Sequence, residues 1–221
     1  MRQQPTTSIW ALDALAAEVA RRQRTGERGV FTNGVFDLLH QGHLRYLQDA
    51  RALGDFLVVG VNDDESVRRI KGPKRPLVPE HERAELVGGL ACVDYVTVFG
   101  DNTAEAVVRA LRPSIYLKGA DYIRGRTDDA TITLRPDELR AVLAGDLRVH
   151  PELAGLAERL AEARVVAEYG GTLCLVSGVP DRSTSALIQR IVERYGSGAA
   201  DGDASSENRL KPQRAQRAQK R

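Results

Sequence analysis

The sequence is poor in cysteine. Two of its 221 residues are cysteines, Cys92 and Cys174, and both lie within apolar segments. Neither has a CxxC partner or a histidine at metal-ligand spacing, so the sequence indicates neither a disulfide framework nor a cysteine-bound metal. We expect both cysteines to be buried core residues.

Long hydrophobic runs and a strong charge of one sign are also missing. No stretch of about 18 apolar residues occurs, and the N-terminus is polar and then amphipathic rather than a signal-peptide core. We therefore expect a cytoplasmic protein without a membrane partner. With 32 Lys and Arg against 30 Asp and Glu, the formal net charge is +2, which does not imply binding to nucleic acid.

What the sequence does contain is an alternation of strand-like and helix-like segments. The run FLVVGV at 56–61 is apolar throughout, which is typical of a strand covered on both faces of a parallel sheet. Further strands are predicted at 29–34, 95–99, 115–117 and 173–176, and helices after a cap at Thr7 or Ser8 and at 42–53, 79–90 and 103–111. This order predicts an α/β, Rossmann-like, doubly wound parallel sheet.

The alternation is interrupted before the last strand. Residues 123–164 contain a polar stretch and two predicted helices, 136–144 and 152–163, so we interpret them as a helical insertion in a domain spanning 1–195. Residues 196–221 are rich in Gly, Ser and Asp and then in Gln, Arg and Lys. We expect this basic tail to be disordered and solvated, with contact to nucleic acid or an acidic partner as the alternative.

The central motif is TNGVFDLLHQGH at 32–43, where the first strand passes to a helix. Ligands of open α/β sheets bind beyond the carboxyl ends of the strands, and a helix N-terminus offers free N–H groups to phosphates. His40 and His43 can project the same way there, and Gly42 lets a phosphate approach the backbone. The alternative is a pair of satisfied polar side chains or metal ligands. We favour a triphosphate site, and we assign no role to His81 or His150.

Basic and hydroxyl side chains follow other strands. Lys71 in RIKG and Lys118 in LKGADY are expected at the same edge of the sheet, where their ammonium groups would meet phosphates. Arg75 and Arg83 offer guanidinium groups that pair with phosphate in bidentate fashion. Solvated surface charges are the alternative for all four. Residues 183–185, Ser-Thr-Ser, precede the last helix, where the residues alone indicate an ordinary helix cap.

Several motifs in order resemble the heptose 1-phosphate adenylyltransferase family of the HxGH cytidylyltransferase-like nucleotidyltransferases. They are the segment 31–99 with its HQGH, then DNTAE, LKGADY, and finally GG followed by RSTSALI. The resemblance covers most of the chain. It implies an enzyme, alone or fused to a sugar kinase, that uses ATP with Mg²⁺ and makes ADP-heptose for lipopolysaccharide or other surface glycans. We assign no side chain of this chain as a metal ligand. It also implies a homodimer.

Position in the chain and the resemblance together assign roles to individual residues. The resemblance implies phosphate contact for His40 and His43, and position at the edge of the sheet adds Lys71 and Lys118 to the catalytic candidates. Those implied to bind the nucleotide are Asn33, Gly34, Val35, Phe36, Asp37, Gly42, Arg83, Ser183, Thr184 and Ser185, with Asp37 ordering the loop. Those implied to bind the sugar phosphate are Arg75, Asp121, Tyr122 and Arg124, with Arg126 nearby.

The chain departs from the family pattern in three ways. The segment between the GADY element and the last strand is longer than usual, Ala120 replaces the second glycine of KGGDY, and Asp181 stands where a glycine is usual. These differences bear on the acceptor sugar and on the geometry of the loops. The longer segment is expected to act as a lid, to shape the sugar pocket or to contact another subunit.

Three other functions are compatible with parts of the pattern. A cytidylyltransferase for glycerol 3-phosphate or a related alcohol phosphate shares the HxGH motif, but its last helix begins RTEGISTT and a tryptophan follows its third strand, unlike VPDRSTS and FGDNTAE here. A class I aminoacyl-tRNA synthetase would carry a KMSKS-like loop, which this chain lacks. A nucleotide-sensing regulator would keep the pocket without turnover.

Overall fold

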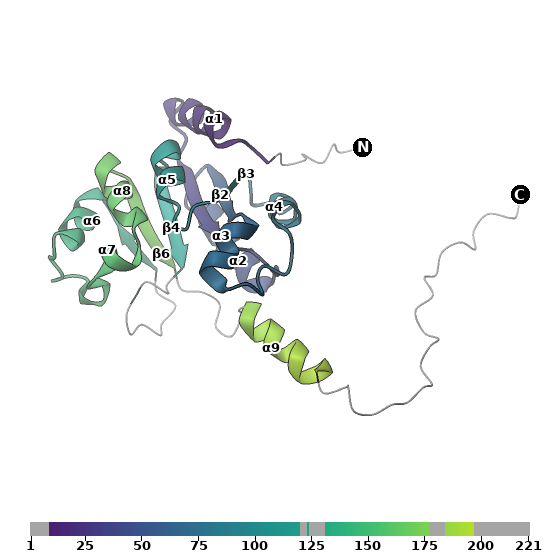
Figure 1. Ribbon diagram of the computed structural model, residues 1–221. Coiled ribbons are helices and arrows are strands. Elements are labelled where there is room, and N and C mark those ends of the chain that lie inside the picture. Colours follow the sequence, from purple (N-terminus) through teal and green to yellow (C-terminus); the bar gives the residue numbers. More distant parts are fainter. Residues whose placement is uncertain (1–8, 120–122, 124–130, 177–183, 197–221) are drawn as a thin grey trace, which may run out of the picture. The chain divides into compact units, whose positions relative to one another are not determined.

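The fold is built on one sheet. The computed structural model describes residues 9–119, 123, 131–176 and 184–196. The strands are β1 Gly29–Gly34, β2 Phe56–Asn62, β3 Tyr95–Phe99, β4 Ile115–Gly119, β5 Ile132–Leu134 and β6 Thr172–Val176. Their order in the sheet is β3-β2-β1-β4-β6-β5, and all neighbours run parallel except β5, which is antiparallel to β6 (Figure 1). The Rossmann-like α/β sheet predicted from the sequence is confirmed.

Helices cover both sides of this sheet (Figure 1). The helices of the described residues are α1 Leu12–Arg24, α2 Gln41–Ala52, α3 Asp64–Lys71, α4 Glu80–Gly88, α5 Glu105–Leu111, α6 Pro136–Leu143, the 3₁₀ turn η2 Pro151–Leu153, α7 Leu156–Arg159, α8 Glu162–Tyr169 and, described by itself, α9 Thr184–Tyr195. The chain divides into two compact units between Thr184 and Ser185, so α9 lies almost entirely in the second unit.

Alternate residues of the strands enter two separate cores. Phe31 of β1 and Tyr116 of β4 join the cluster that α1, α5, α6 and α8 cover. Their neighbours Val30 and Leu117 join the second cluster, which α2 and α4 cover. Because successive side chains of a strand point to opposite faces, apolar residues at every position satisfy both cores. This explains why the strands lack a polar alternation.

The strand order fixes the edge at which a ligand binds. The chain passes from β1 outward through β2 to β3, and then crosses to β4 on the other side of β1. β1 and β4 are therefore the strands at which the direction of winding reverses. In sheets of this kind the crevice beyond the carboxyl ends of these strands is the usual ligand site. Here those ends are Asn33-Gly34 and Lys118-Gly119.

Some predicted helices were wrong in their bounds. The first helix begins at Leu12 rather than after Thr7 or Ser8, because Ile9 makes a parallel bridge with Val96 of β3. The single helix predicted at 152–163 is broken into η2, α7 and the start of α8. Gly155, with φ of +68°, interrupts the helical backbone before α7.

Two elements were not predicted at all. α3 begins at an Asp63 cap, whose carboxylate accepts from the Ser66 amide at 2.7 Å, and ends at Gly72 with φ of +93°. β5 lies within the segment interpreted as a helical insertion and extends the sheet beyond β6. That segment therefore adds a strand as well as helices.

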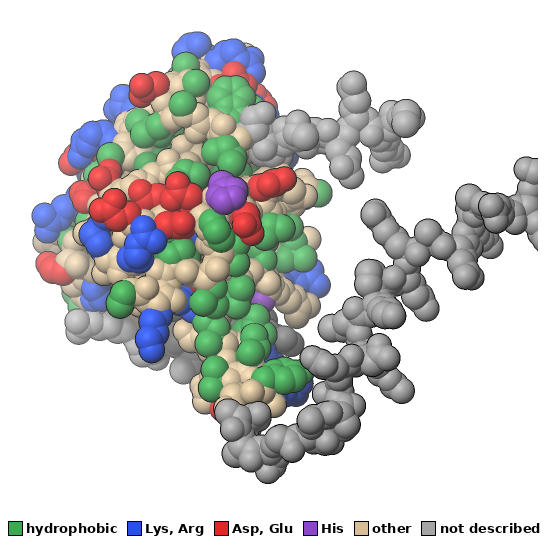
Figure 2. Space-filling model, turned by 45° about the vertical axis from the view of Figure 1, so that its right-hand side comes forward, with side chains coloured by type: hydrophobic (Ala, Val, Ile, Leu, Met, Phe, Trp, Pro, Cys, Tyr) green, Lys and Arg blue, Asp and Glu red, His purple; other side chains and the backbone are tan. Residues whose placement is uncertain are grey.

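The described surface mixes charges of both signs. On the face drawn in Figure 2, acidic side chains gather in a band and basic side chains lie beside it. Within the described part of the chain, no helix combines the length and the apolar character needed to cross a membrane.

Candidate active site

The histidine motif lies where β1 passes to α2. His40 is the N-cap of α2, with extended backbone angles, and its Nδ1 accepts a hydrogen bond from the Gly42 amide at 3.1 Å. The neutral ring therefore carries its proton on Nε2. The imidazoles of His40 and His43 are stacked, with centroids 3.9 Å apart and an angle of 21° between the planes. The structure brings the two predicted histidines together.

The surroundings keep His43 neutral. Its pKa is lowered from 6.5 to about 4, first by burial and then by the neighbouring His40, while a backbone contact with Leu38 opposes the change. At neutral pH the ring therefore offers an N–H donor rather than a full charge. A polyanionic ligand beside it would favour the imidazolium form.

Phe36 holds the turn before the histidines in an unusual conformation. Its φ is +49°, in the left-handed region that side chains other than glycine seldom adopt. Its buried ring lies edge-on to His43, with centroids 5.4 Å apart. A Cβ on Gly34 would lie 3.1 Å from this ring, so the small residue leaves room for Phe36. Residues 34–36 therefore shape one wall of the histidine pair.

Asp37 connects this turn to the segment before α4. Its carboxylate is buried, and Oδ1 accepts hydrogen bonds from the amides of Leu77 and Val78 at 2.7 and 2.9 Å. Oδ2 forms an ion pair with Nε of Arg75 at 2.7 Å. Arg75, which was expected to bind the sugar phosphate, thus has Asp37 as its partner. These contacts agree with a loop-ordering role for Asp37.

Arg83 has no exposed surface. The sequence predicted a direct nucleotide contact for this guanidinium, yet it is 0% exposed on α4. Its Nε donates to the Val78 carbonyl at 2.8 Å, Nη1 to the Val35 carbonyl at 2.6 Å, and Nη2 to Asp64 Oδ1 at 2.7 Å. Each nitrogen of the guanidinium therefore donates to a protein oxygen, where a phosphate oxygen was expected.

Asn33 and Lys118 meet across the point where the winding reverses. Asn33 Oδ1 accepts from the Tyr116 hydroxyl at 2.8 Å and from Lys118 Nζ at 3.3 Å. The hydroxyl of Tyr46, on α2, lies 2.6 Å from Thr32 Oγ1 and donates to the Leu117 carbonyl at 3.2 Å. β1, β4 and α2 are thereby joined beneath the histidine motif.

Comparison with known proteins identifies the family to which this geometry belongs. Residues 31–144, more than half of the chain, match the family model described as cytidylyltransferase-like. The chain belongs to this family. The stretch that matches includes the histidine motif, the network around Arg83 and the Lys118 end of β4.

Curated proteins are also similar to this chain. The "Bifunctional protein HldE" of Geobacter sulfurreducens is 41% identical over 84% of this chain, and that of Pelobacter propionicus is 43% identical over 83%. That of Helicobacter pylori is 56% identical over 46%. The resemblance indicated by the motifs is thus confirmed. The chain spans about a third of the length of the first two relatives, 31% of each.

A solved structure also matches part of the chain. It is titled "Crystal structure of the lipopolysaccharide core biosynthesis protein from Thermoplasma volcanium GSS1". It is 35% identical, covers 47% of this chain and 80% of its own, and has a TM-score of 0.40.

Other residues predicted for this cytidylyltransferase-like site are not brought to the histidines by the described structure. Lys71 is the exposed last residue of α3. Asp121, Tyr122, Arg124, Arg126 and Ser183 lie outside the described residues. Thr184 and Ser185 open α9, which is described by itself. The contacts assigned to these residues stay predictions.

Sequence reasoning missed three residues that make contacts at this site. Asp64 binds Arg83, Tyr116 binds Asn33, and Tyr46 contacts Thr32 and the Leu117 carbonyl. Asp64 follows β2 at the carboxyl edge, so the rule that pointed to Lys118 also applied to it. Tyr46 lies three residues after His43, on the same face of α2. Tyr116 carried no signal, because an apolar strand position does not reveal where a hydroxyl is directed.

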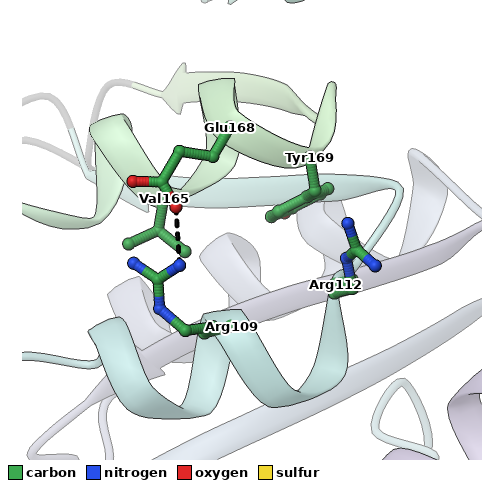
Figure 3. A pocket seen from close by; sticks show the side chains of 5 residues that line it. All are labelled: Arg109, Arg112, Val165, Glu168 and Tyr169. Carbon is green, nitrogen blue, oxygen red and sulfur yellow. Dashed lines mark hydrogen bonds and ion pairs between the residues drawn. The ribbon is translucent and has the colours of Figure 1, made fainter.

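A cavity of about 230 Å³ lies away from the histidine motif. It is lined by Arg109 and Arg112 from the α5 region and by Val165, Glu168 and Tyr169 of α8 (Figure 3). The Arg109–Glu168 ion pair, at 2.6 Å, crosses one side, and the Arg112 guanidinium carbon lies 5.7 Å from the centre of the Tyr169 ring. None of these residues was predicted to act.

Proposed function

We propose that this chain is a nucleotidyltransferase that joins AMP from ATP to a heptose 1-phosphate, giving ADP-heptose and pyrophosphate. The observation that carries the proposal is the stacked histidine pair at the N-terminus of α2, beside the carboxyl ends of β1 and β4. The resemblance of the motifs to the heptose 1-phosphate adenylyltransferases supports the sugar and the adenine nucleotide, and the similarity to proteins named HldE supports that resemblance.

The proposed reaction needs no covalent enzyme intermediate. A phosphate oxygen of the sugar attacks the α-phosphorus of ATP, and the bond from that phosphorus to the oxygen bridging to the β-phosphate breaks. The electron pair leaves with pyrophosphate. Catalysis then consists of positioning and of stabilising the charge on the leaving group. His40 and His43 would donate to the phosphates, and Lys118 and Lys71 would supply positive charge.

The resemblance also implies Mg²⁺. Within the described residues, no group of three or more His, Cys, Asp or Glu side chains is arranged to hold a metal ion. Mg²⁺ prefers to keep waters and to bind substrate phosphates with few protein ligands. We therefore propose that the ion arrives on the phosphates of ATP, where it would offset part of their charge.

The decisive experiment measures pyrophosphate release. The purified chain is incubated with Mg²⁺, each of the four nucleoside triphosphates, and either heptose 1-phosphate or glycerol 3-phosphate, and the products are identified by mass spectrometry. We expect pyrophosphate to be released only when ATP and heptose 1-phosphate are supplied together. Release with CTP and glycerol 3-phosphate would instead favour the alcohol-phosphate enzyme, and tight ATP binding without any release would favour a regulator.

Two further properties belong to the same proposal. A homodimer is implied by the resemblance, and sedimentation velocity at several protein concentrations tests it. A cytoplasmic location fits the use of ATP and a sugar phosphate, and cell fractionation tests it.

A further inference from the structure

Arg83 is the largest fully buried side chain of the described structure. A guanidinium removed from water is costly unless each donor finds a well-aligned acceptor. Here the three acceptors come from three different segments: Val35 follows β1, Asp64 opens α3 after β2, and Val78 precedes α4. One side chain thus ties together three loops at the carboxyl edge of the sheet.

The contacts of Arg83 and Asp37 form a closed ring. Arg83 donates to the carbonyls of Val35 and Val78, and the amide of the same Val78 donates to Asp37. Val35 and Asp37 are the two chain neighbours of Phe36. The residue with positive φ is therefore held on both sides, by Arg83 through one neighbour and by the Leu77–Val78 amides through the other.

Such backbone strain persists only where the surroundings impose it. The ring of contacts provides this restraint from outside the turn. His40 is restrained separately, since its imidazole caps α2 through the Gly42 amide. Loosening the ring would therefore disturb residues 35–37 more than the histidine that caps the helix.

We propose that Arg83 is a positioning residue for the nucleotide: its buried guanidinium, shared by Val35, Val78 and Asp64, fixes the strained 35–37 turn against which the nucleotide binds. The inference rests on the proposed nucleotidyl transfer. It replaces the direct phosphate contact expected for Arg83 with an action through the backbone of the turn.

Arg83→Lys tests this role. A lysine keeps the positive charge but has one compact ammonium in place of a planar fork, so it cannot reach all three acceptors with good geometry. We expect the KM for ATP to rise about tenfold or more, kcat to fall less than about threefold, and the KM for the sugar phosphate to stay within about twofold, because uniform binding of the nucleotide is lost.

Arg109→Lys is the matched control. Arg109 also donates to a carboxylate at 2.6 Å, but its side chain is 60% exposed and lies on α5. The kinetic constants of the Arg109→Lys variant should equal those of the wild type. Assays are run well below the melting temperature, with the folded fraction checked by circular dichroism, so that lower stability alone does not change KM.

A second variant guards against failure of Arg83→Lys to fold. Asp64 is 26% exposed, and Asp64→Asn keeps an oxygen for Arg83 while removing the charge. This variant should raise the KM for ATP by about two- to fivefold, because the acceptor of the Arg83 hydrogen bond changes from a charged carboxylate to a neutral amide. Hydrogen exchange at the amides of residues 35–39 should speed up in both variants.

The outcomes separate the two proposals. If the wild type neither binds ATP nor releases pyrophosphate with any pair of substrates, the proposed function fails and this inference fails with it. If the wild type is active but both variants keep its KM for ATP, or lower kcat alone, the positioning role is refuted while the function stands.

Discussion

His40 and His43 lie against each other but are held by different contacts. His40 is fixed by the amide it caps, whereas His43 is fixed by burial and by the ring of Phe36. Before ligand binds, the lowered pKa of His43 means that this ring presents a donor without charge. Binding of a polyphosphate would then favour protonation of the His43 imidazole, next to the phosphates on which negative charge builds up during transfer.

Removing the His43 imidazole should therefore slow the chemical step. We expect His43→Ala to lower kcat for pyrophosphate release by about a hundredfold, which is the effect of deleting one charge-stabilising donor. His81→Ala is the control, because His81 lies on α4 with its side chain 72% exposed and has no assigned role. Equal rates for the two variants in a steady-state assay would refute the assignment of His43.

Titration of His43 should also make the free energy of unfolding depend on pH. Its pKa is about 4 in the folded chain against 6.5 unfolded, so between these values the unfolded chain binds more protons and stability falls as the pH falls. Between pH 7 and pH 4.5 this amounts to about 2 kcal/mol, allowing for partial exposure.

His43→Gln removes this titration while keeping a polar side chain of similar size. Urea unfolding at both pH values measures the effect, and the wild type should lose more stability on acidification than the variant. The same loss in both proteins would mean that His43 is not the group responsible.

At this scale the sequence predicted that the two histidines meet but not what each site residue contacts. The HxGH spacing and its position between strand and helix were enough to pair the histidines. Arg83 shows the limit: in HERAELV the arginine follows a glutamate, with another glutamate two positions later, and nothing in that pattern reveals that its side chain turns inward to bind Val35 and Val78. Burial of a charge depends on backbone oxygens brought from distant segments, which periodicity does not describe.

At the scale of elements, helices and strands with a long apolar pattern could be predicted from the sequence, whereas the short α3 and β5 were missed. β2 and α2 are long and strongly apolar on their buried faces, and their positions followed from the sequence. β5 has three residues, too few to display an alternation, and it exists because its edge pairs with β6. α3 could have been found from its Asp63 cap, its acidic first turn and Gly72 at its end.

A hydrogen bond between α8 and the start of α5 allows a prediction about how α5 is stabilised. Glu162 is 5% exposed, and its Oε1 accepts from the amide of Ala104, the N-cap of α5, at 2.7 Å. Ala104 is itself buried, so Glu162→Ala leaves a buried N–H without its partner. We expect the free energy of unfolding to fall by about 1–3 kcal/mol.

Glu168→Ala, on the same helix, is the control for that measurement. Its ion pair with Arg109 is exposed on both sides, so the loss should stay below about 1 kcal/mol. Urea unfolding followed by the fluorescence of Trp10, the single tryptophan, compares the two variants. A smaller loss for Glu162→Ala than for Glu168→Ala would contradict the capping role.

At the scale of the whole molecule, the site and the core use different parts of the same sheet. Both apolar clusters run along the two faces, whereas the histidines, Asp37 and Lys118 gather at one edge where β1 and β4 diverge. The order of strands and helices predicted this edge, because right-handed crossovers leave few ways to wind such a chain. No comparable rule applies to the second unit, because α9 is a single amphipathic helix and the winding of the sheet does not determine its position.

The start of α9 carries the last predicted site residues. Thr184 and Ser185 are its first two residues, and Ser183 precedes them. If Ser183, Thr184 and Ser185 hold the phosphates of ATP, a chain ending at Arg182 should have a KM for ATP about tenfold or more higher, because several charge-assisted hydrogen bonds are lost. A chain ending at Gly196 keeps α9 and should match the full chain in its KM for ATP. Unchanged kinetics after the longer deletion would remove these three residues from the site, whereas a lower KM after the shorter one would assign the basic tail a role in regulating nucleotide binding.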